Sequence, residues 1–222
     1  MLTAPEPVVC YVTHRKSLGA DDPEAKLIAT IGRAIAAGAS WVQIREKDLP
    51  ARRLLEVARD AVRASNGHGA LVFVNDRLDV ALASGAAGVH LGGESLEARE
   101  AIRWLREGNA PRGFRVGVSC HAVQEVVAAE RGGADYVFFG PIYDTPAKRR
   151  FGAPQGVAKL AEVCAAMKIP VIAIGGVDAS NAAECIRAGA AGIAAIRMFQ
   201  EARDPAVLAD TIGQLRRVER GS

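Results

Sequence analysis

The chain repeats a Gly-Ala pair followed each time by a short apolar run, and this repeat constrains the fold more than any other feature. Copies of this junction recur at similar intervals at Gly38-Ala39, Gly85-Ala86, Gly133-Ala134 and Gly189-Ala190. Glycine just past a helix can adopt the left-handed conformation that ends it. Each pair therefore predicts the end of a helix, and the apolar run after it predicts a strand.

Apolar runs of a second kind lie between these copies. Together the two sets predict eight strands, at Val8–Val12, Trp41–Arg45, Leu71–Val74, Gly88–Leu91, Phe114–Val118, Tyr136–Phe139, Pro170–Ile174 and Gly192–Ile196. Helical i, i+3, i+4 spacing separates them, as in Leu27 to Ile35 and Leu54 to Val62. Strands that alternate with helices pair in parallel through right-handed crossovers.

Eight such units predict a single α/β domain, an eight-stranded parallel (β/α)8 or TIM barrel over residues 1–222. We expect flexible ends at about residues 1–6 and 219–222. An open doubly wound sheet is the alternative. That fold more often shows a glycine-rich fingerprint after its first strand, and the sequence Tyr-Val-Thr-His-Arg-Lys at this point is not one.

Composition narrows the possible partners. The balance of 28 basic and 25 acidic residues, a net charge of +3, is too even for a dedicated nucleic-acid binder but allows a local anion site. No apolar run approaches the ~18 residues of a membrane span, and no secretory signal is visible. The four cysteines lack C-x-x-C spacing, which argues against a zinc site or a redox dithiol. We therefore expect buried thiols in a reducing cytosol. We therefore expect a cytoplasmic protein with small-molecule ligands, without nucleic-acid or membrane partners, and with a homo-oligomer possible.

In such a barrel, function lies at the carboxyl ends of the strands. Along the second strand and just after it, side-chain alternation places Gln43, Arg45 and Lys47 on one face, which we expect to point into the barrel mouth. An arginine fork and a lysine point charge on one face suit the binding of a diphosphate. The alternative is that these cations are rim charges paired with Glu46 and Asp48.

The third and fourth strands precede candidate metal ligands. Asp76 can bind Mg²⁺, or it can cap the helix expected at Leu78–Ala83. Glu94 is a candidate second ligand of the same metal, and Ser95 is a good N-cap for the next helix. A lone histidine in a strand, such as His90, is more often a core residue with satisfied hydrogen bonds than a catalyst.

Ser119-Cys120-His121 follows the fifth strand. Cys120 and His121 look like a nucleophile and its base, but adjacent strand residues point to opposite faces, which disfavours a thiolate catalyst. Ser119 is better read as a hydrogen-bond donor to phosphate. His121 is either a residue near a helix N-cap or a general acid/base.

The last three strands precede candidates for a further phosphate site. The long segment 140–152 after the sixth strand is either a lid closing over an anionic substrate or a solvated basic loop. Glycines after the seventh strand let backbone N–H groups approach phosphate closely, or serve only a tight turn. The candidates are Thr145 and Lys148 in the loop, Gly175 and Gly176 after the seventh strand, and Ile196 and Arg197 after the eighth.

With these motifs placed, the chain resembles the thiamine phosphate synthase family and its thiazole tautomerase relatives. The segments that carry the resemblance are Gly38–Lys47, Val74–Arg77, Gly88–Gly92, Gly117–Ser119, Gly140–Thr145, Lys148 and Ile174–Gly176. Each motif alone is weak. They run in family order over nearly the whole chain, however, and the ordered set is specific.

The resemblance implies an enzyme that joins 4-amino-2-methyl-5-(diphosphooxymethyl)pyrimidine to a thiazole phosphate, with Mg²⁺ as cofactor. Diphosphate leaves with Mg²⁺ assistance, and the thiazole nitrogen attacks the pyrimidine methylene. By resemblance, the pyrimidine diphosphate is held by Gln43, Arg45, Lys47, Asn75, Ser119 and Lys148, Mg²⁺ by Asp76, and the thiazole phosphate by Thr145, Gly176 and the Ile196-Arg197 turn.

Three positions depart from the family pattern. Ser95 stands where the family usually has a second metal-binding Asp, Ala147 where it often has a second Thr, and Arg197 where it has a small hydroxyl residue. The lost carboxylate would weaken Mg²⁺ binding unless Glu94 substitutes for it, and Arg197 would either charge the phosphate site or block it.

These departures keep two alternatives open. One is a thiazole tautomerase, which needs no Mg²⁺ and uses a histidine matching His121 as its acid/base. The other is a non-catalytic barrel that binds a thiamine precursor. The retained cations on the second strand, together with Asn75 and Asp76, favour the synthase, because a tautomerase has no diphosphate to hold.

Overall fold

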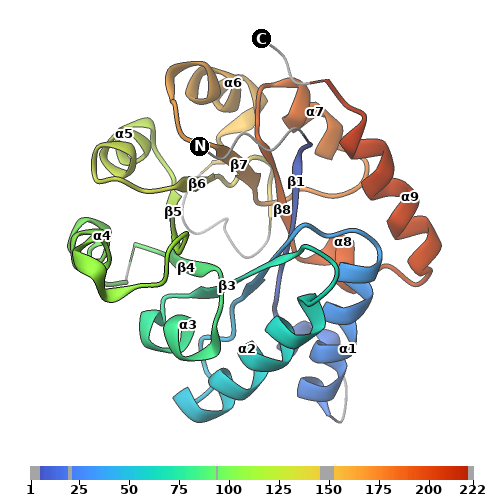
Figure 1. The fold of residues 1–222 in the computed structure, drawn as a ribbon. Coiled ribbons are helices and arrows are strands. Elements are labelled where there is room, and N and C mark those ends of the chain that lie inside the picture. The colour runs from blue at the N-terminus through green and yellow to red at the C-terminus, as the bar shows by residue number, and fades with distance from the viewer. Residues whose placement is uncertain (1–5, 20–21, 94, 146–152, 220–222) are drawn as a thin grey trace.

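A closed ring of parallel strands forms the centre of the computed structural model, which describes residues 6–19, 22–93, 95–145 and 153–219. The strands are β1 Val8–Val12, β2 Trp41–Ile44, β3 Leu71–Asn75, β4 Gly88–Leu91, β5 Arg115–Cys120, β6 Tyr136–Phe139, β7 Val171–Ile174 and β8 Gly192–Ala195. They pair in sequence order, and β8 pairs in parallel with β1. The predicted eight-stranded barrel is therefore confirmed, with strand ends shifted by at most two residues (Figure 1).

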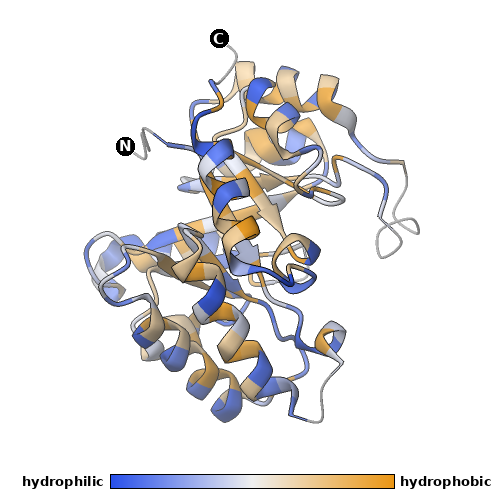
Figure 2. Cartoon of the chain, turned by 90° about the vertical axis from the view of Figure 1, so that its right-hand side faces the viewer, coloured by the Kyte–Doolittle hydropathy of each residue, from blue (hydrophilic) through white to orange (hydrophobic). Residues whose placement is uncertain are grey.

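Helices surround this ring (Figure 1). They are α1 Pro23–Ala36, α2 Ala51–Ser65, α3 Leu78–Ser84, α4 Ala98–Trp104, α5 Val123–Arg131, α6 Gly156–Ala166, α7 Ala182–Arg187, α8 Arg197–Gln200 and α9 Pro205–Arg216, with the short turns η1 Arg15–Leu18 and η2 Leu105–Asn109. Their hydrophilic residues face outward, around a hydrophobic centre (Figure 2). Within the described ranges, no helix combines the length and apolar character needed to cross a membrane.

Alternating strand residues divide the apolar core into two parts. Val42 and Ile44 of β2 face the helices, whereas Trp41 faces the barrel interior. Inside the barrel, Trp41, Phe73 and Tyr136 form an aromatic layer with ring centroids 4.7–5.4 Å apart. The interior is therefore a packed core rather than a channel.

Glycines make room for this interior. A Cβ atom at Gly117 would lie 2.1 Å from Cζ of Tyr136, so the tyrosine ring occupies the space that a side chain on β5 would need. A Cβ atom at Gly192 would lie 2.1 Å from the carbonyl oxygen of Val8. Glycine at this position thus permits the contact between β8 and β1 that closes the ring.

We predict that Gly192→Ala lowers the free energy of unfolding by about 1–3 kcal/mol, because the added methyl group meets backbone that cannot move without opening the sheet. Gly32→Ala in α1 is the matched control, since its Cβ would contact nothing within 4 Å. The control should stabilise the protein by about 0.5–1 kcal/mol through helix propensity. Urea unfolding measures both, and equal effects of the two variants would contradict this account.

Candidate active site

Strand β2 and the segment that follows it supply an amide and two cations to the mouth of the barrel. Gln43 is 2% exposed, and its Nε2 has no hydrogen-bond partner among the described residues. Arg45 and Lys47 line a cavity of ≈ 290 Å³ together with His14. The backbone N–H of Arg45 donates to the Thr13 hydroxyl at 2.9 Å, which ties the segment to the end of β1. The predicted alternation that separates Gln43 from Val42 and Ile44 is thus confirmed.

For Arg45, the alternative of a rim charge paired with Glu46 or Asp48 is wrong among the described contacts, and Lys47 lies 3.5 Å from the Asp76 carboxylate. Arg15 pairs with both acids instead: Nη1 lies 3.2 Å from the Glu46 carboxylate and 2.6 Å from that of Asp48. The backbone N–H of Arg15 also donates to Glu46 at 3.0 Å. Hydrogen bonds from Arg15 and Lys16 hold the pKa of Asp48 well below its ordinary value.

Arg15 was not among the candidates from sequence. Its partners lie more than thirty residues away, and no local pattern announces them. Because Arg15 takes up the acids of this segment, the Arg45 guanidinium makes no ion pair within the part of the chain that the structure describes.

Asp76 follows β3 and receives donors from several directions. Asn75 Nδ2 donates to Oδ2 at 2.6 Å and Lys47 Nζ lies 3.5 Å from the same oxygen, while Oδ1 accepts from the Gly92 N–H at 3.2 Å and from the Ser95 hydroxyl. Burial acts to raise the pKa of Asp76, but the Ser95 hydrogen bond and the charge of Lys47 outweigh it and hold the pKa below its ordinary value. The carboxylate is therefore ionised at neutral pH.

Two helix-capping alternatives are corrected by these contacts. The N-cap of α3 is Arg77, and the Asp76 side chain does not cap this helix. The N-cap of α4 is Glu97, so the prediction that Ser95 caps this helix is wrong. The Ser95 hydroxyl instead accepts from the Gly92 N–H at 2.7 Å and donates to Asp76. Asp76 also has a φ of 62°, a left-handed conformation that aspartate tolerates better than most residues.

A buried chain of hydrogen bonds orients Ser119. His90 Nε2 lies 2.9 Å from the Ser119 hydroxyl, and Nδ1 lies 3.2 Å from the Tyr136 hydroxyl. Burial lowers the pKa of His90 to about 3, so the imidazole is neutral and links the two hydroxyl groups. The interpretation of His90 as a core residue with satisfied hydrogen bonds is confirmed.

Cys120 and His121 do not form a nucleophile and base. Cys120 is buried on the helix-facing side, and burial raises the pKa of its thiol to about 12. His121 is exposed, and its Nδ1 lies 2.5 Å from the carbonyl oxygen of Gly140. Because a carbonyl oxygen only accepts, Nδ1 is the donor in this pair, and His121 is held beside the start of the segment after β6.

The glycines after β7 meet this segment closely. Gly175 and Gly176 have φ angles of 93° and 70°, and a Cβ atom at Gly176 would lie 2.7 Å from Cβ of Tyr143. The Tyr143 N–H donates to the Gly175 carbonyl at 2.9 Å. Close packing and the turn therefore both require glycine here. The carbonyl oxygen of Asp144, the residue before the half-buried Thr145, would lie 2.9 Å from a Cβ atom at Gly176.

The remaining predicted residues fall in two groups. Ile196 is the N-cap of α8, and Arg197 is the exposed first residue of this helix. In the same helix, Gln200 Nε2 donates to the His14 carbonyl at 3.0 Å. Because His14 also lines the cavity of Arg45, this bond connects α8 to that cavity. Glu94 and Lys148 lie outside the described residues.

The described donors fit Mg²⁺ shared with a substrate. No group of three or more His, Cys, Asp and Glu side chains able to hold a metal exists among the described residues. Asp76 offers one ionised carboxylate and Ser95 one hydroxyl, beside a cavity of ≈ 180 Å³. Mg²⁺ is commonly held by one or two carboxylates together with waters and substrate phosphates, so this set suits a metal completed by a diphosphate.

Fold and site together define a class: a (β/α)8 barrel whose mouth carries a buried amide, two cations and an ionised carboxylate. A family model described as thiamine monophosphate synthase matches residues 9–199, and the chain belongs to this family. The resemblance found in the sequence is thereby confirmed.

Individual relatives of this chain carry names of the same family. A putative thiamine-phosphate synthase of Geobacter sulfurreducens is 44% identical over 194 residues, 87% of each chain. The thiamine-phosphate synthase of Methanoculleus marisnigri is 45% identical over 163 residues, 73% of this chain and 75% of that protein. The solved structure of a thiamine phosphate pyrophosphorylase from Pyrococcus furiosus superposes with a TM-score of 0.81 at 28% identity, covering 97% of both chains.

We predict that Tyr136→Phe lowers the free energy of unfolding by about 1–3 kcal/mol, because it leaves a buried His90 nitrogen without a partner. Tyr143→Phe is the matched control, since its hydroxyl donates to a surface carboxylate, that of Glu184, which water can solvate instead. The control should cost less than about 1 kcal/mol. Urea unfolding of both variants measures the difference, and similar losses would contradict a special role for the buried chain.

Inorganic diphosphate tests the cations at the mouth. Arg45→Met and Lys47→Met should each weaken its binding about tenfold, since each removes a charge-assisted contact. Lys159→Met is the control, because Lys159 pairs with Glu162 on the outer surface of α6. Isothermal titration calorimetry gives the affinities. Equal affinity in wild type and both mouth variants would show that diphosphate binds elsewhere.

Proposed function

We propose that this protein is a transferase that makes thiamine phosphate from 4-amino-2-methyl-5-(diphosphooxymethyl)pyrimidine and a thiazole phosphate. The observation that carries the proposal is the arrangement of Arg45 and Lys47 next to the ionised Asp76, with the unpartnered amide of Gln43 on the same face. The family model and the names of the relatives support it. Such an arrangement suits one substrate that carries both a diphosphate and a hydrogen-bonding ring.

In this reaction the bond between the pyrimidine methylene and the diphosphate oxygen breaks, and the diphosphate leaves with the electron pair. The lone pair of the thiazole nitrogen then forms the new carbon–nitrogen bond, and no proton is transferred. Catalysis therefore depends on neutralising the leaving charge and on positioning two substrates. This requirement agrees with a site in which His90 is neutral and buried and no general base is needed.

The chain's own residues divide this work. Arg45 and Lys47 bind the diphosphate oxygens, and Ser119, oriented by His90, donates a further hydrogen bond to them. Gln43 Nε2 donates to an acceptor on the pyrimidine, which satisfies an otherwise costly buried amide. Asp76 and Ser95 would hold Mg²⁺, and the ion would supply further positive charge against the leaving group.

The other substrate is held by the later strands in this proposal. Thr145, the Gly176 N–H and Arg197 bind the thiazole phosphate, and Lys148 adds a charge to the diphosphate of the first substrate. Glu94 is proposed as a further metal ligand in place of the carboxylate that the family usually has at the position of Ser95.

A thiazole tautomerase is the second candidate, and one contact favours it. The hydrogen bond between His121 Nδ1 and the Gly140 carbonyl leaves Nε2 as the nitrogen that can accept a proton. Ser95 in place of a metal-binding carboxylate agrees with a reaction that uses no Mg²⁺. A barrel that binds a thiamine precursor without turning it over is the third possibility, from a different functional class.

Incubation with both substrates, with and without Mg²⁺, separates these candidates. The synthase predicts thiamine phosphate only when the metal is present. A metal-independent proton shift in the thiazole alone would replace it with the tautomerase, and binding without turnover of either substrate would favour the non-catalytic barrel.

We further predict that Asp76→Asn lowers kcat/KM for coupling by about 10²–10³-fold, since it removes the ionised group beside the leaving diphosphate. Asp79→Asn is the matched control, because the only ion pair of Asp79 among the described residues is with Arg77 at the exposed start of α3. The control should retain wild-type activity. If Asp76→Asn also retained it, the proposed role of this carboxylate would be wrong.

A further inference from the structure

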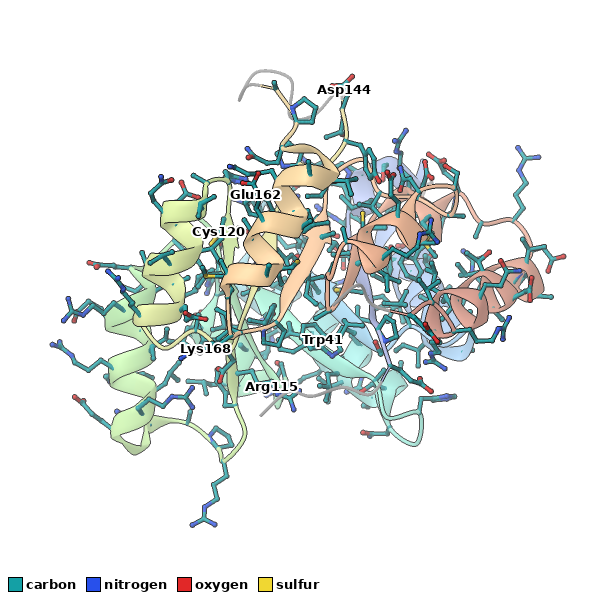
Figure 3. The ribbon with its side chains drawn as sticks, turned by 90° about the horizontal axis from the view of Figure 1, so that it is seen from above. Trp41, Arg115, Cys120, Asp144, Glu162 and Lys168 are labelled. Carbon is teal, nitrogen blue, oxygen red and sulfur yellow. The ribbon has the colours of Figure 1, made fainter. Side chains whose placement is uncertain are left out.

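A second cavity, of ≈ 790 Å³, lies at the opposite end of the barrel from the candidate active site. Residues at or just before the amino ends of β5, β6, β7 and β8 line it, among them Arg115, Asp135 and Val171. Figure 3 shows Arg115 and Lys168 far from Asp144, which marks the catalytic end. The volume falls within the range of small-molecule sites in proteins.

The aromatic layer makes this cavity a separate compartment. Tyr136 lies across Gly117, two residues further along β5 than Arg115, and contacts Trp41 and Phe73. These rings fill the interior between the two ends. A molecule in this second cavity therefore does not reach the residues that bind diphosphate in the proposed function.

The described side chains that line this cavity carry unequal charge. Three cations line it, Arg106, Arg115 and Lys168, against the single carboxylate of Asp135. That carboxylate is already engaged by Arg106 at 3.0 Å and by the Val116 N–H at 2.7 Å. Within the described ranges, the side chains of Arg115 and Lys168 form no ion pair.

Arg115 shows the clearest need for a ligand. It begins β5 on the inward face, because its neighbour Val116 packs in the helix-facing core. Its Nη1 atom is buried and has no hydrogen-bond partner among the described residues. A buried charged donor without an acceptor is costly, and each such group in a native protein calls for an explanation. An oxyanion in the cavity supplies the missing acceptor.

The rest of the lining is apolar. Phe114, Met167, Ile169 and Pro170 contribute to the wall, and the Cys164 thiol there is kept neutral, because burial raises its pKa to about 12. A fully hydrated inorganic ion would leave this surface unused. The lining therefore favours a ligand that has an apolar body as well as a charged group.

We propose that this cavity binds a small organic phosphate monoester, with Arg115 as its anchor and Lys168 as the second cation. A monoester dianion balances the two cations that have no carboxylate partner among the described residues, and its organic body covers the apolar wall. This site goes beyond the proposed coupling reaction and is separate from the diphosphate site at the other end.

Methyl NMR of the full chain labelled with [¹³C-methyl]methionine tests the proposal, with phenyl phosphate as the probe. Met167 lines the cavity, whereas Met198 lies in α8 at the catalytic end, next to Arg197, and reports separately on phosphate binding there. We expect a saturable shift of the Met167 signal whose midpoint is independent of any shift of the Met198 signal. An unshifted Met167 signal at about 10 mM probe, a concentration that detects millimolar affinity, would overturn the proposal.

Variants then identify the anchor. Arg115→Leu and Lys168→Leu should each weaken phenyl phosphate binding at least about tenfold, and the exposed position of Lys168 means that its variant keeps the fold. Arg112→Leu is the matched control, because Arg112 is exposed, lies close in sequence and does not line the cavity. Unchanged affinity in both Leu variants, or equal affinity for inorganic phosphate or benzoate, would overturn the assignment.

Discussion

The contact between β1 and β8 closes the sheet, and the arrangement of the molecule depends on it. Gly192 permits this contact, because any side chain there would meet the Val8 carbonyl. Closure brings the ends of the first, second and eighth strands to one rim, where Gln200 of α8 binds the His14 carbonyl beside Arg45. An open sheet would place these residues at distant edges. The mouth is thus a consequence of ring closure rather than of any local sequence.

Polar groups inside the ring are ordered by their partners. Arg15 forms ion pairs with Glu46 and Asp48, and Arg45 has no ion-pair partner among the described residues. Neutral His90 orients the Ser119 hydroxyl from within the core. The protein therefore fixes the direction of its donors in advance, and such preorganised dipoles stabilise developing negative charge without rearrangement during the reaction.

Sequence patterns predicted what depends on local periodicity. The strands and the inward face of Gln43 follow from alternation, and the ends of α1, α3, α5 and α7 follow from the glycines of the four Gly-Ala junctions. Contacts between distant segments were not predictable. Ser95 resembles a helix cap because it precedes a helical pattern. In the structure its hydroxyl donates instead to Asp76, nineteen residues away. The links from His90 to Tyr136 and Ser119 join three strands and depend on ring geometry that no single segment encodes.

The left-handed backbone of Asp76 restricts which sequences can occupy this position. Glycine and asparagine adopt such a conformation readily, but neither carries a charge, whereas glutamate keeps the charge at a conformational cost and with a longer reach. Each of these substitutions of Asp76 therefore loses either the negative charge or the favourable backbone conformation. Ser95, which contacts Asp76, has no left-handed backbone, so substitutions there meet no such restriction.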